Sequence, residues 1–279
     1  MIMTEVLTPR AITPMTQSLE ASCVPTAISM VFSGFGLNIS EETLVDKYFQ
    51  TARLPVGDLD AGVSNTDTVR GVLRAIEDEE LRDSLQVDIF APYLYEYTFS
   101  PEQRYIVEAK PTAIKKYARG FKDDSSTREF YETLEQLAKK NEIGVYTANS
   151  RLMGFSKRFD PFRRVPEESR RGFYDELTAF IKKGHIIGPH GGMTLHTWAL
   201  DGTRMEPLDY RPEEEGFVVV DPRGKSYVVS LSSLVWVDSM EIRGDVFDYL
   251  FRVSPREKRS NPQSSSFRAY LQHFRDLIP

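Results

Sequence analysis

Apolar and polar residues alternate with a helical period through much of the first part of the chain. Residues 23–33 carry apolar side chains three and four positions apart, and Gly34 and Gly36 follow them as a stop signal. A second helix is predicted to begin at Ser40, whose hydroxyl can cap it and whose neighbouring glutamates favour a helix start. A third amphipathic helix is predicted to carry Val69, Val72, Leu73 and Ile76, with its cap at Asn65 to Asp67, so this part of the chain is expected to be mainly helical.

The following stretch, from about residue 85 to 175, has a less regular pattern. Residues 86–90 are typical of a strand, and the aromatic residues at every second position of 93–99 predict another strand. Helices are predicted over about 125–138 and 173–183, the second of which ends in two lysines and a glycine. Later apolar runs that predict strands occupy residues 185–187, 194–200, 217–221, 227–231 and 246–253.

The last part of the chain departs from this pattern. Residues 254–266 are rich in proline, serine, asparagine and charged residues, which predicts a linker. Apolar residues at helical spacing then form one stripe, which predicts an amphipathic C-terminal helix that docks on its own domain. The stripe consists of Phe267, Tyr270, Leu271, Phe274 and Leu277. We therefore expect one domain over residues 1–253, followed by a linker and a terminal helix over 254–279.

The composition is that of an ordinary globular protein, with 41% hydrophobic and 27% charged residues in a chain of 279. The net charge of −6 offers no electrostatic footprint for nucleic acid, so no nucleic-acid partner is expected. One basic stretch, residues 151–171, could contact an acidic partner, although a solvated loop is the simpler interpretation. No run approaches the roughly 18 apolar residues that a membrane-spanning helix needs, so no membrane partner is expected.

Cysteine usage and the N-terminus bear on the cellular compartment. The chain has one cysteine, Cys23, and therefore no internal disulfide, which fits a reducing compartment. The N-terminus shows no basic stretch followed by an apolar run, so no signal peptide is predicted. We expect a cytoplasmic protein, and a secreted effector without a signal peptide would have the same features.

Cys23 stands at the predicted start of a helix, with Pro25 where a first helical turn tolerates proline. The unpaired N–H groups and the positive dipole end of a helix start favour thiolate over thiol. Because the thiolate is the nucleophilic form, this position suits covalent catalysis. The alternative is that Cys23 is a small buried hydrophobic residue, which is the common role of a free cysteine.

His196 is the best placed of the four histidines to act with Cys23. Its predicted strand and the strand ending at Asp221 flank a loop, and an antiparallel pairing is the simplest connection between them. The midpoint between positions 196 and 221 lies between residues 208 and 209, so His196 and Asp221 should lie about opposite each other. A carboxylate beside an imidazole fixes its tautomer and supports its cation. Taken alone, His196 could be structural and Asp221 could be a strand-ending turn.

Gln17 precedes the cysteine on the approach to the same helix. Its side-chain N–H and the backbone N–H of Cys23 would supply two donors for a developing oxyanion, whereas the simpler interpretation is an exposed loop amide. His185 and His190 raise the question of a metal site with His196. Their spacing fits no common zinc pattern and no cysteine pair accompanies them, so we expect no metal and no cofactor.

Together these segments resemble the papain-like cysteine peptidases, and specifically their bacteriocin-processing (C39-like) group. The resemblance covers about half of the chain, residues 13–80 and 180–240. The usual glycine after the cysteine is replaced by Val24, and residues 85–175 have no counterpart in the compact family domain. The matching motifs are Gln17 to Phe32 with a Cys-x-Pro start, Gly62-Val-Ser, Lys183-Gly184, the His196 strand, and Asp221-Pro-Arg-Gly followed by Leu231 to Trp236.

The resemblance implies a papain-like α+β fold, in which the Cys23 helix packs against an antiparallel sheet and residues 85–175 form an inserted cap. It implies a triad of Cys23 as nucleophile, His196 as base and then acid, and Asp221 as the orienting carboxylate. It also implies Gln17 as oxyanion donor and a thioester intermediate. The expected activity is that of a cysteine peptidase with a peptide or protein substrate.

Two other functions fit the same residues. The triad could serve a glutamine deamidase, an amidase or an acyltransferase, because a fold does not determine its chemistry. The chain could instead be a non-catalytic module, in which the inserted region and the basic stretch over 151–171 bind a peptide or protein partner.

Overall fold

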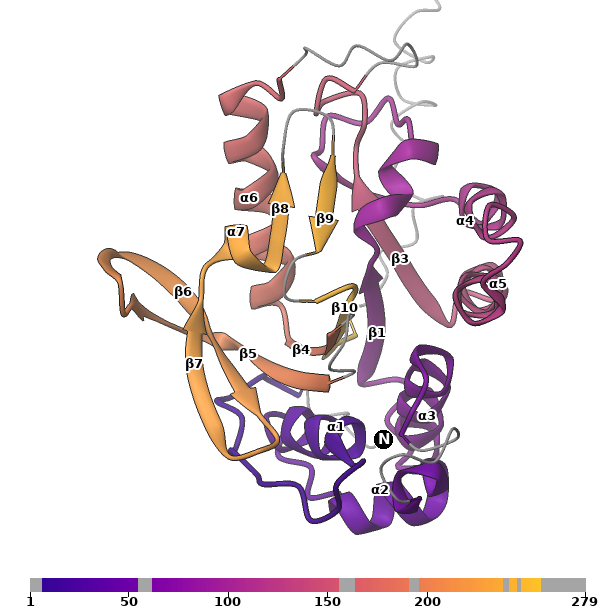
Figure 1. Ribbon diagram of the computed structural model, residues 1–279, viewed down its shortest axis with the longest axis vertical. Helices are drawn as coiled ribbons and strands as arrows, with labels where there is room; N and C mark the ends of the chain where they lie inside the picture. The colour runs from indigo at the N-terminus through magenta and orange to yellow at the C-terminus, as the bar shows by residue number, and fades with distance from the viewer. Residues whose placement is uncertain are drawn as a thin grey trace, which may run out of the picture.

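An eight-stranded mixed sheet runs through the chain and organises the helices around it (Figure 1). The structure, a computed structural model, describes residues 7–54, 62–155, 164–190, 196–237, 241–244 and 247–256. The predicted C-terminal helix, most of the predicted linker and the centre of the basic stretch lie outside the described residues.

Helices precede the first strand, strands and helices alternate over residues 85–182, and one short helix interrupts the strands that follow. The strands are β1 (Leu85–Phe90), β2 (Ile106–Glu108), β3 (Ile143–Ala148), β4 (His185–His190), β5 (His196–Leu208), β6 (Arg211–Asp221), β7 (Lys225–Val229), β8 (Val235–Val237), β9 (Ile242–Gly244) and β10 (Leu250–Pro255). The order in the main sheet is β2-β3-β1-β10-β4-β5-β6-β7, and β8 pairs separately with β9. Within the main sheet β1 and β3 are parallel, and the other neighbouring pairs are antiparallel. The fold is therefore α+β, as the sequence predicts.

Helices cover both faces of this sheet. They are α1 (Cys23–Ser33), α2 (Glu41–Tyr48), α3 (Asn65–Asp78), α4 (Pro111–Ala118), α5 (Ser125–Lys139), α6 (Glu167–Lys182) and α7 (Leu231–Leu234), with short 3-10 helices η1 (Gln50–Arg53) and η2 (Pro92–Tyr97). One buried cluster joins α1, α3, α4 and α5 to one face, and a second joins α6 to the other. Along β5, Ala199 belongs to the first cluster and Leu200 to the second, as the two-residue period of a strand requires. Among the helices described, none is both long and apolar enough to cross a bilayer.

The helices of the first part begin at residues that can cap them. Ser40 Oγ accepts the Thr43 N–H at 3.1 Å at the start of α2, which confirms the predicted cap. Ser64 Oγ accepts the Asp67 N–H at 3.0 Å at the start of α3, just before the predicted cap residues. Each such bond satisfies an otherwise unpaired N–H and is worth about 1 kcal/mol.

Residues 93–99 are not a strand, contrary to the alternating pattern of their aromatic side chains. Most of them lie in η2, in which the adjacent residues Leu94 and Tyr95 are both buried. Pro92 begins this helix, and the Thr98 hydroxyl closes its end by donating to the Leu94 carbonyl at 2.9 Å. The prediction was wrong because Pro92 and the Thr98 hydroxyl stabilise a 3-10 helix here, so the alternation of the aromatic residues does not come from the pleat of a strand.

Two regions expected outside the sheet are part of it. Residues 85–148, expected in an inserted cap, supply β1, β2 and β3, and β1 pairs directly with β10. The loop expected between residues 200 and 217 is mostly strand, because β5 continues to Leu208 and β6 begins at Arg211. The far end of this hairpin stands clear of the other labelled elements at the left of Figure 1.

A buried ion pair joins the middle of the sheet to α6. Arg252 of β10 donates through Nη2 to Asp88 of β1 and through Nη1 to the Phe180 carbonyl at 2.7 Å. The guanidinium carbon also lies 3.8 Å from the centre of the Phe180 ring. A buried charge is tolerated when it is paired and hydrogen-bonded, so these contacts hold β1, β10 and α6 in one arrangement.

A second buried pair anchors the N-terminal segment to the sheet. Asp201 of β5 accepts the Ile12 N–H at 3.0 Å and the Thr203 N–H at 2.9 Å, and its Oδ1 lies 3.5 Å from His185 Nδ1. A Cβ at Gly34 would lie 2.3 Å from His185 Nε2, so the imidazole fits only against a glycine. Burial lowers the pKa of His185, and the Asp201 carboxylate offsets this only in part.

From the lowered pKa of His185 beside Asp201 we predict that the stability of the fold depends on pH. A histidine whose pKa is lowered in the folded state binds its proton more readily in the unfolded chain. The free energy of unfolding should therefore fall as the pH drops through the ordinary value of 6.5. Urea unfolding at about pH 7.5 and about pH 5.5 measures this loss, which has an upper limit of about 1.4 kcal/mol per pH unit for one proton. His185→Gln should reduce the loss, and an unchanged pH slope in that variant would contradict the assignment.

Candidate active site

Cys23 is the first residue of α1, which packs against β4 and β5. The thiol is half-buried and hydrogen-bonds the backbone and the hydroxyl of Thr197 on β5. These bonds lower the pKa of the thiol, as does the backbone N–H of Val24, but burial raises it more. The pKa of Cys23 is therefore raised overall, whereas the sequence predicted that the helix start would favour thiolate. Loss of water around the sulfur outweighs the nearby donors, so the resting group is a neutral thiol.

His196 and Asp221 form a buried pair. Nε2 of His196, on the first residue of β5, lies 2.7 Å from Oδ1 of Asp221, the last residue of β6. The same Oδ1 accepts the Arg223 N–H at 2.7 Å, and Gly224 closes the turn with a φ of +83°. Asp221 thus pairs with His196 and also forms the strand-ending turn, so the two roles considered from the sequence do not exclude each other. With Nε2–H donating to the carboxylate, the lone pair of the neutral imidazole is on Nδ1.

The register of the β5–β6 ladder differs from the predicted one. Ala199 pairs with Val220, which puts Asp221 across from Trp198 rather than from His196. The predicted centre of the connection lay between residues 208 and 209, but the chain turns at 209–210, one residue later. Moving the centre of a hairpin by one residue moves the register by two, so His196 reaches Asp221 along a diagonal.

Aromatic side chains cover the His196–Asp221 pair. The Trp198 ring centre lies 6.1 Å from that of His196 and 5.4 Å from that of Tyr227, and Phe247 packs against Trp198 at 5.7 Å. Burial, and to a lesser degree the charge of Asp221, raise the pKa of Tyr227, so this hydroxyl stays neutral. Excluding water in this way strengthens the bond between the imidazole and the carboxylate.

Cys23 and His196 contact different residues of β5, Thr197 and Trp198, and do not bond each other. Thr197 contacts the thiol on the face covered by α1, while His196 contacts Trp198, whose neighbours belong to the opposite face. In the part of the chain that the structure describes, no hydrogen bond or ion pair joins Cys23 to His196. The structure therefore brings two of the three predicted triad residues into contact and places the third beside the same end of β5.

Gln17 lies in the loop that leads to α1. Its backbone N–H donates to the Pro222 carbonyl at 2.7 Å, which docks this loop on the Asp221 turn. Both side-chain donor bonds go to carbonyls of the same loop, those of Leu19 and Glu20, at 2.9 Å each. The side-chain amide of Gln17, predicted to donate to a substrate oxygen, therefore stabilises the conformation of its own loop in this structure.

The sequence analysis did not identify Glu41 as part of this arrangement. Its Oε1 accepts the hydroxyls of Ser22 at 2.5 Å and of Ser18 at 3.0 Å, and its Oε2 accepts the Ser18 N–H at 3.0 Å. The loop before Cys23 is therefore held by α2 on one side and by the Asp221 turn on the other. Glu41 was visible in the sequence only as an acidic residue at a helix start, because its contacts to Ser18 and Ser22 depend on the packing of α1 against α2.

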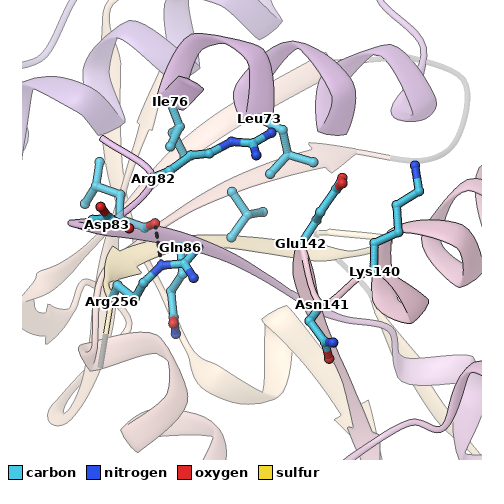
Figure 2. A pocket seen from close by; sticks show the side chains of 11 residues that line it. Leu73, Ile76, Arg82, Asp83, Gln86, Lys140, Asn141, Glu142 and Arg256 are labelled. Carbon is cyan, nitrogen blue, oxygen red and sulfur yellow. Dashed lines mark hydrogen bonds between the residues drawn. The ribbon is translucent and has the colours of Figure 1, made fainter. Parts of the chain in front are cut away.

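The three histidines considered for a metal do not form one cluster. The β4–β5 ladder pairs His190 with His196, while His185 lies at the other end of β4 beside Asp201. Among the described residues no group of three potential ligands is close enough to hold a metal ion. A hollow of about 300 Å³ between α3 and the starts of β1 and β3 (Figure 2) is lined by none of the four predicted site residues.

No family model, curated protein or solved structure matches this chain. Its function is therefore argued from the chemistry of the residues described above, since an α+β fold alone does not specify an activity.

The contact between Thr197 and Cys23 predicts an effect on thiol reactivity. Thr197→Val removes the hydroxyl that stabilises the thiolate, so alkylation of Cys23 by iodoacetamide near neutral pH should slow by about tenfold. Thr197→Ser keeps the hydroxyl and is the matched control. The second-order rate of labelling, followed by mass spectrometry, measures the effect. Equal rates for the valine and serine variants would show that the hydroxyl does not support the thiolate.

Proposed function

We propose that this protein is a cysteine hydrolase of papain-like architecture that cleaves a peptide or protein amide. The observation that carries the proposal is the buried pair of His196 and Asp221 at the end of β5 where the next residue, Thr197, contacts Cys23 at the start of α1. A lone cysteine or a lone strand histidine is usually structural, but a buried carboxylate that orients an imidazole next to a helix-terminal thiol is typical of nucleophilic catalysis.

In the proposed mechanism His196 acts as general base. The resting thiol of Cys23 is neutral because of its burial, so it must lose a proton when substrate arrives. Nδ1 of His196 is the nitrogen that can take this proton, since Nε2 faces Asp221. The thiolate is then supported by the α1 N-terminus and the Thr197 donors, and the imidazolium by Asp221. The thiol contacts Thr197 on one face of β5 while His196 contacts Trp198 on the other, so in this mechanism substrate binding has to turn the imidazole at the start of β5 towards the thiol.

The chemical steps follow from these roles. The sulfur of Cys23 bonds to the carbonyl carbon of the scissile amide, and His196 returns the proton to the departing amine as the C–N bond breaks. Water then attacks the thioester with His196 again as base, which releases the acid and restores the thiol. Gln17 donates to the transient oxyanion: its amide has two hydrogens, so one can turn to the substrate while the other keeps a loop carbonyl. A single free cysteine fits a reducing compartment, and we place the activity in the cytoplasm.

The assignment predicts that Cys23→Ala and His196→Ala each lower activity by about a thousandfold or more, while both variants stay folded; His196→Ala should also lower the thermal unfolding midpoint, because it leaves the buried Asp221 carboxylate without its partner. The measurement compares the new N-termini that appear in a cell lysate treated with wild type or with either variant. Full activity in a folded variant would remove that residue from the mechanism. A gain of about one dalton on substrate glutamines, without new N-termini, would indicate deamidation by the same residues instead.

Substitutions of Asp221 should lower activity and stability to different degrees. Asp221→Asn keeps an oxygen that can accept both the Arg223 N–H and the His196 Nε2–H, but it removes the charge that supports the imidazolium. Activity should therefore fall by less than in Cys23→Ala, and Asp221→Ala should also lose stability because the turn loses its acceptor. Activity and urea unfolding measured on both variants separate the two roles. A stable Asp221→Ala variant with wild-type activity would contradict both of them.

A further inference from the structure

A serine precedes four of the described helices, and three of these serines cap their helix in the usual way. Ser40, Ser64 and Ser230 each accept the N–H of the third helical residue through Oγ, at 3.1, 3.0 and 3.2 Å. Ser22, which precedes α1, makes no such bond. The exception is therefore at the helix that begins with Cys23.

The sequence of α1 explains why Ser22 does not cap it. The third helical residue is Pro25, which has no N–H to donate. The N–H of Thr26 donates to the Ser22 carbonyl at 3.0 Å. This helix start therefore leaves two N–H groups without a helical acceptor, those of Cys23 and Val24, and both hydrogen-bond the Cys23 sulfur.

Glu41 gives the Ser22 hydroxyl a partner outside α1. Its Oε1 accepts this hydroxyl at 2.5 Å, which is typical of a bond to an ionised carboxylate and shorter than the 2.9 Å to the Leu19 carbonyl. Glu41 is the first residue of α2, where the helix N-terminus stabilises a carboxylate. A serine before a helix can also bond the N–H of the second helical residue, which is Val24 in α1. Without Glu41, the Ser22 oxygen would therefore compete with the sulfur for that N–H.

We propose that Glu41 is a positioning residue, which holds the Ser22 hydroxyl and so keeps the N–H groups at the start of α1 available to the Cys23 sulfur. This inference rests on the proposed role of Cys23 as nucleophile. The thiolate depends on these donors more than the thiol does, because hydrogen bonds to a charged group are the stronger ones. The negative charge of Glu41 acts in the opposite direction, since it disfavours a second anion nearby. The experiment therefore has to hold the charge constant while it changes the contact.

Two matched pairs of variants do this. Glu41→Ala and Glu41→Gln both remove the charge, but only glutamine keeps an oxygen that can accept the Ser22 hydroxyl. Glu41→Asp keeps the charge on a shorter side chain and is compared with the wild type. Iodoacetamide should label Cys23 about fivefold more slowly in the alanine variant than in the glutamine variant, and more slowly in the aspartate variant than in the wild type. In both slower variants the midpoint of the pH profile of labelling, followed by mass spectrometry, should lie at a higher pH.

A second substitution distinguishes this role from simple support of the loop. Added to Glu41→Ala, Ser22→Ala removes the competing oxygen and should restore the labelling rate to that of the glutamine variant. Support of the loop alone predicts no such rescue. Glu42→Ala is the control, because it removes an exposed carboxylate of the same helix turn that does not bond Ser22, and it should change the rate little.

Equal labelling rates in the alanine and glutamine variants, or a further loss when Ser22→Ala is added, would overturn the proposal. If Glu41→Ala does not fold, the comparison of Glu41→Asp with the wild type decides, and equal rates there would overturn it as well. Alkylation of Cys23 needs no turnover of a substrate. Its outcome is therefore separate from the search for new N-termini, which tests the proposed hydrolase itself.

Discussion

The antiparallel pairing of β5 with β6 is the constraint on which the candidate site depends. This ladder brings His196 within 2.7 Å of Asp221 and holds Thr197 against the thiol of Cys23. Further along the same strand, Asp201 accepts the backbone of Ile12 and so ties down the N-terminal segment. One strand therefore positions the imidazole of His196, contacts α1 and anchors the N-terminal segment. A shift of this ladder by one residue would reverse the faces of all these side chains at once.

The state of Cys23 results from two opposed effects. A helix start and the donors of Thr197 favour the thiolate, while removal of water disfavours it, and the loss of hydration is the larger effect. In the proposed mechanism, Cys23 is therefore a nucleophile that is neutral at rest and becomes charged only when His196 takes its proton. His196 is suited to that task because Asp221 occupies one of its ring nitrogens and leaves the other for the thiol proton. The loop before Cys23 is held between Glu41 and the Asp221 turn, so the surroundings of the sulfur are set by several elements together.

Sequence patterns were informative where the responsible interaction is local. Ser40 was correctly predicted as the cap of α2, where it accepts the N–H three residues later, and the cap of α3 is Ser64, one residue before the predicted ones. The alternating aromatic residues of 93–99 misled because Pro92 and the Thr98 hydroxyl stabilise a 3-10 helix whose adjacent residues both face the core. The pairing of His196 with Asp221 was predicted correctly, but in a register two residues away, because the turn lies at 209–210. The bonds of Gln17 to its own loop had no signal in the sequence, since they depend on how that loop docks on the Asp221 turn.

The sequence by itself determined the α+β class and the start of α2, and it singled out the few residues on which the proposed catalysis depends. Those features depend on residue type and on spacings of two to four positions, which act within one helix or strand. Only the tertiary structure decided that residues 85–148 complete the main sheet, that burial raises the pKa of Cys23, and that Thr197 is the residue of β5 that contacts the thiol. Such facts depend on contacts between residues far apart in the chain, and the strand order of the sheet sets those contacts.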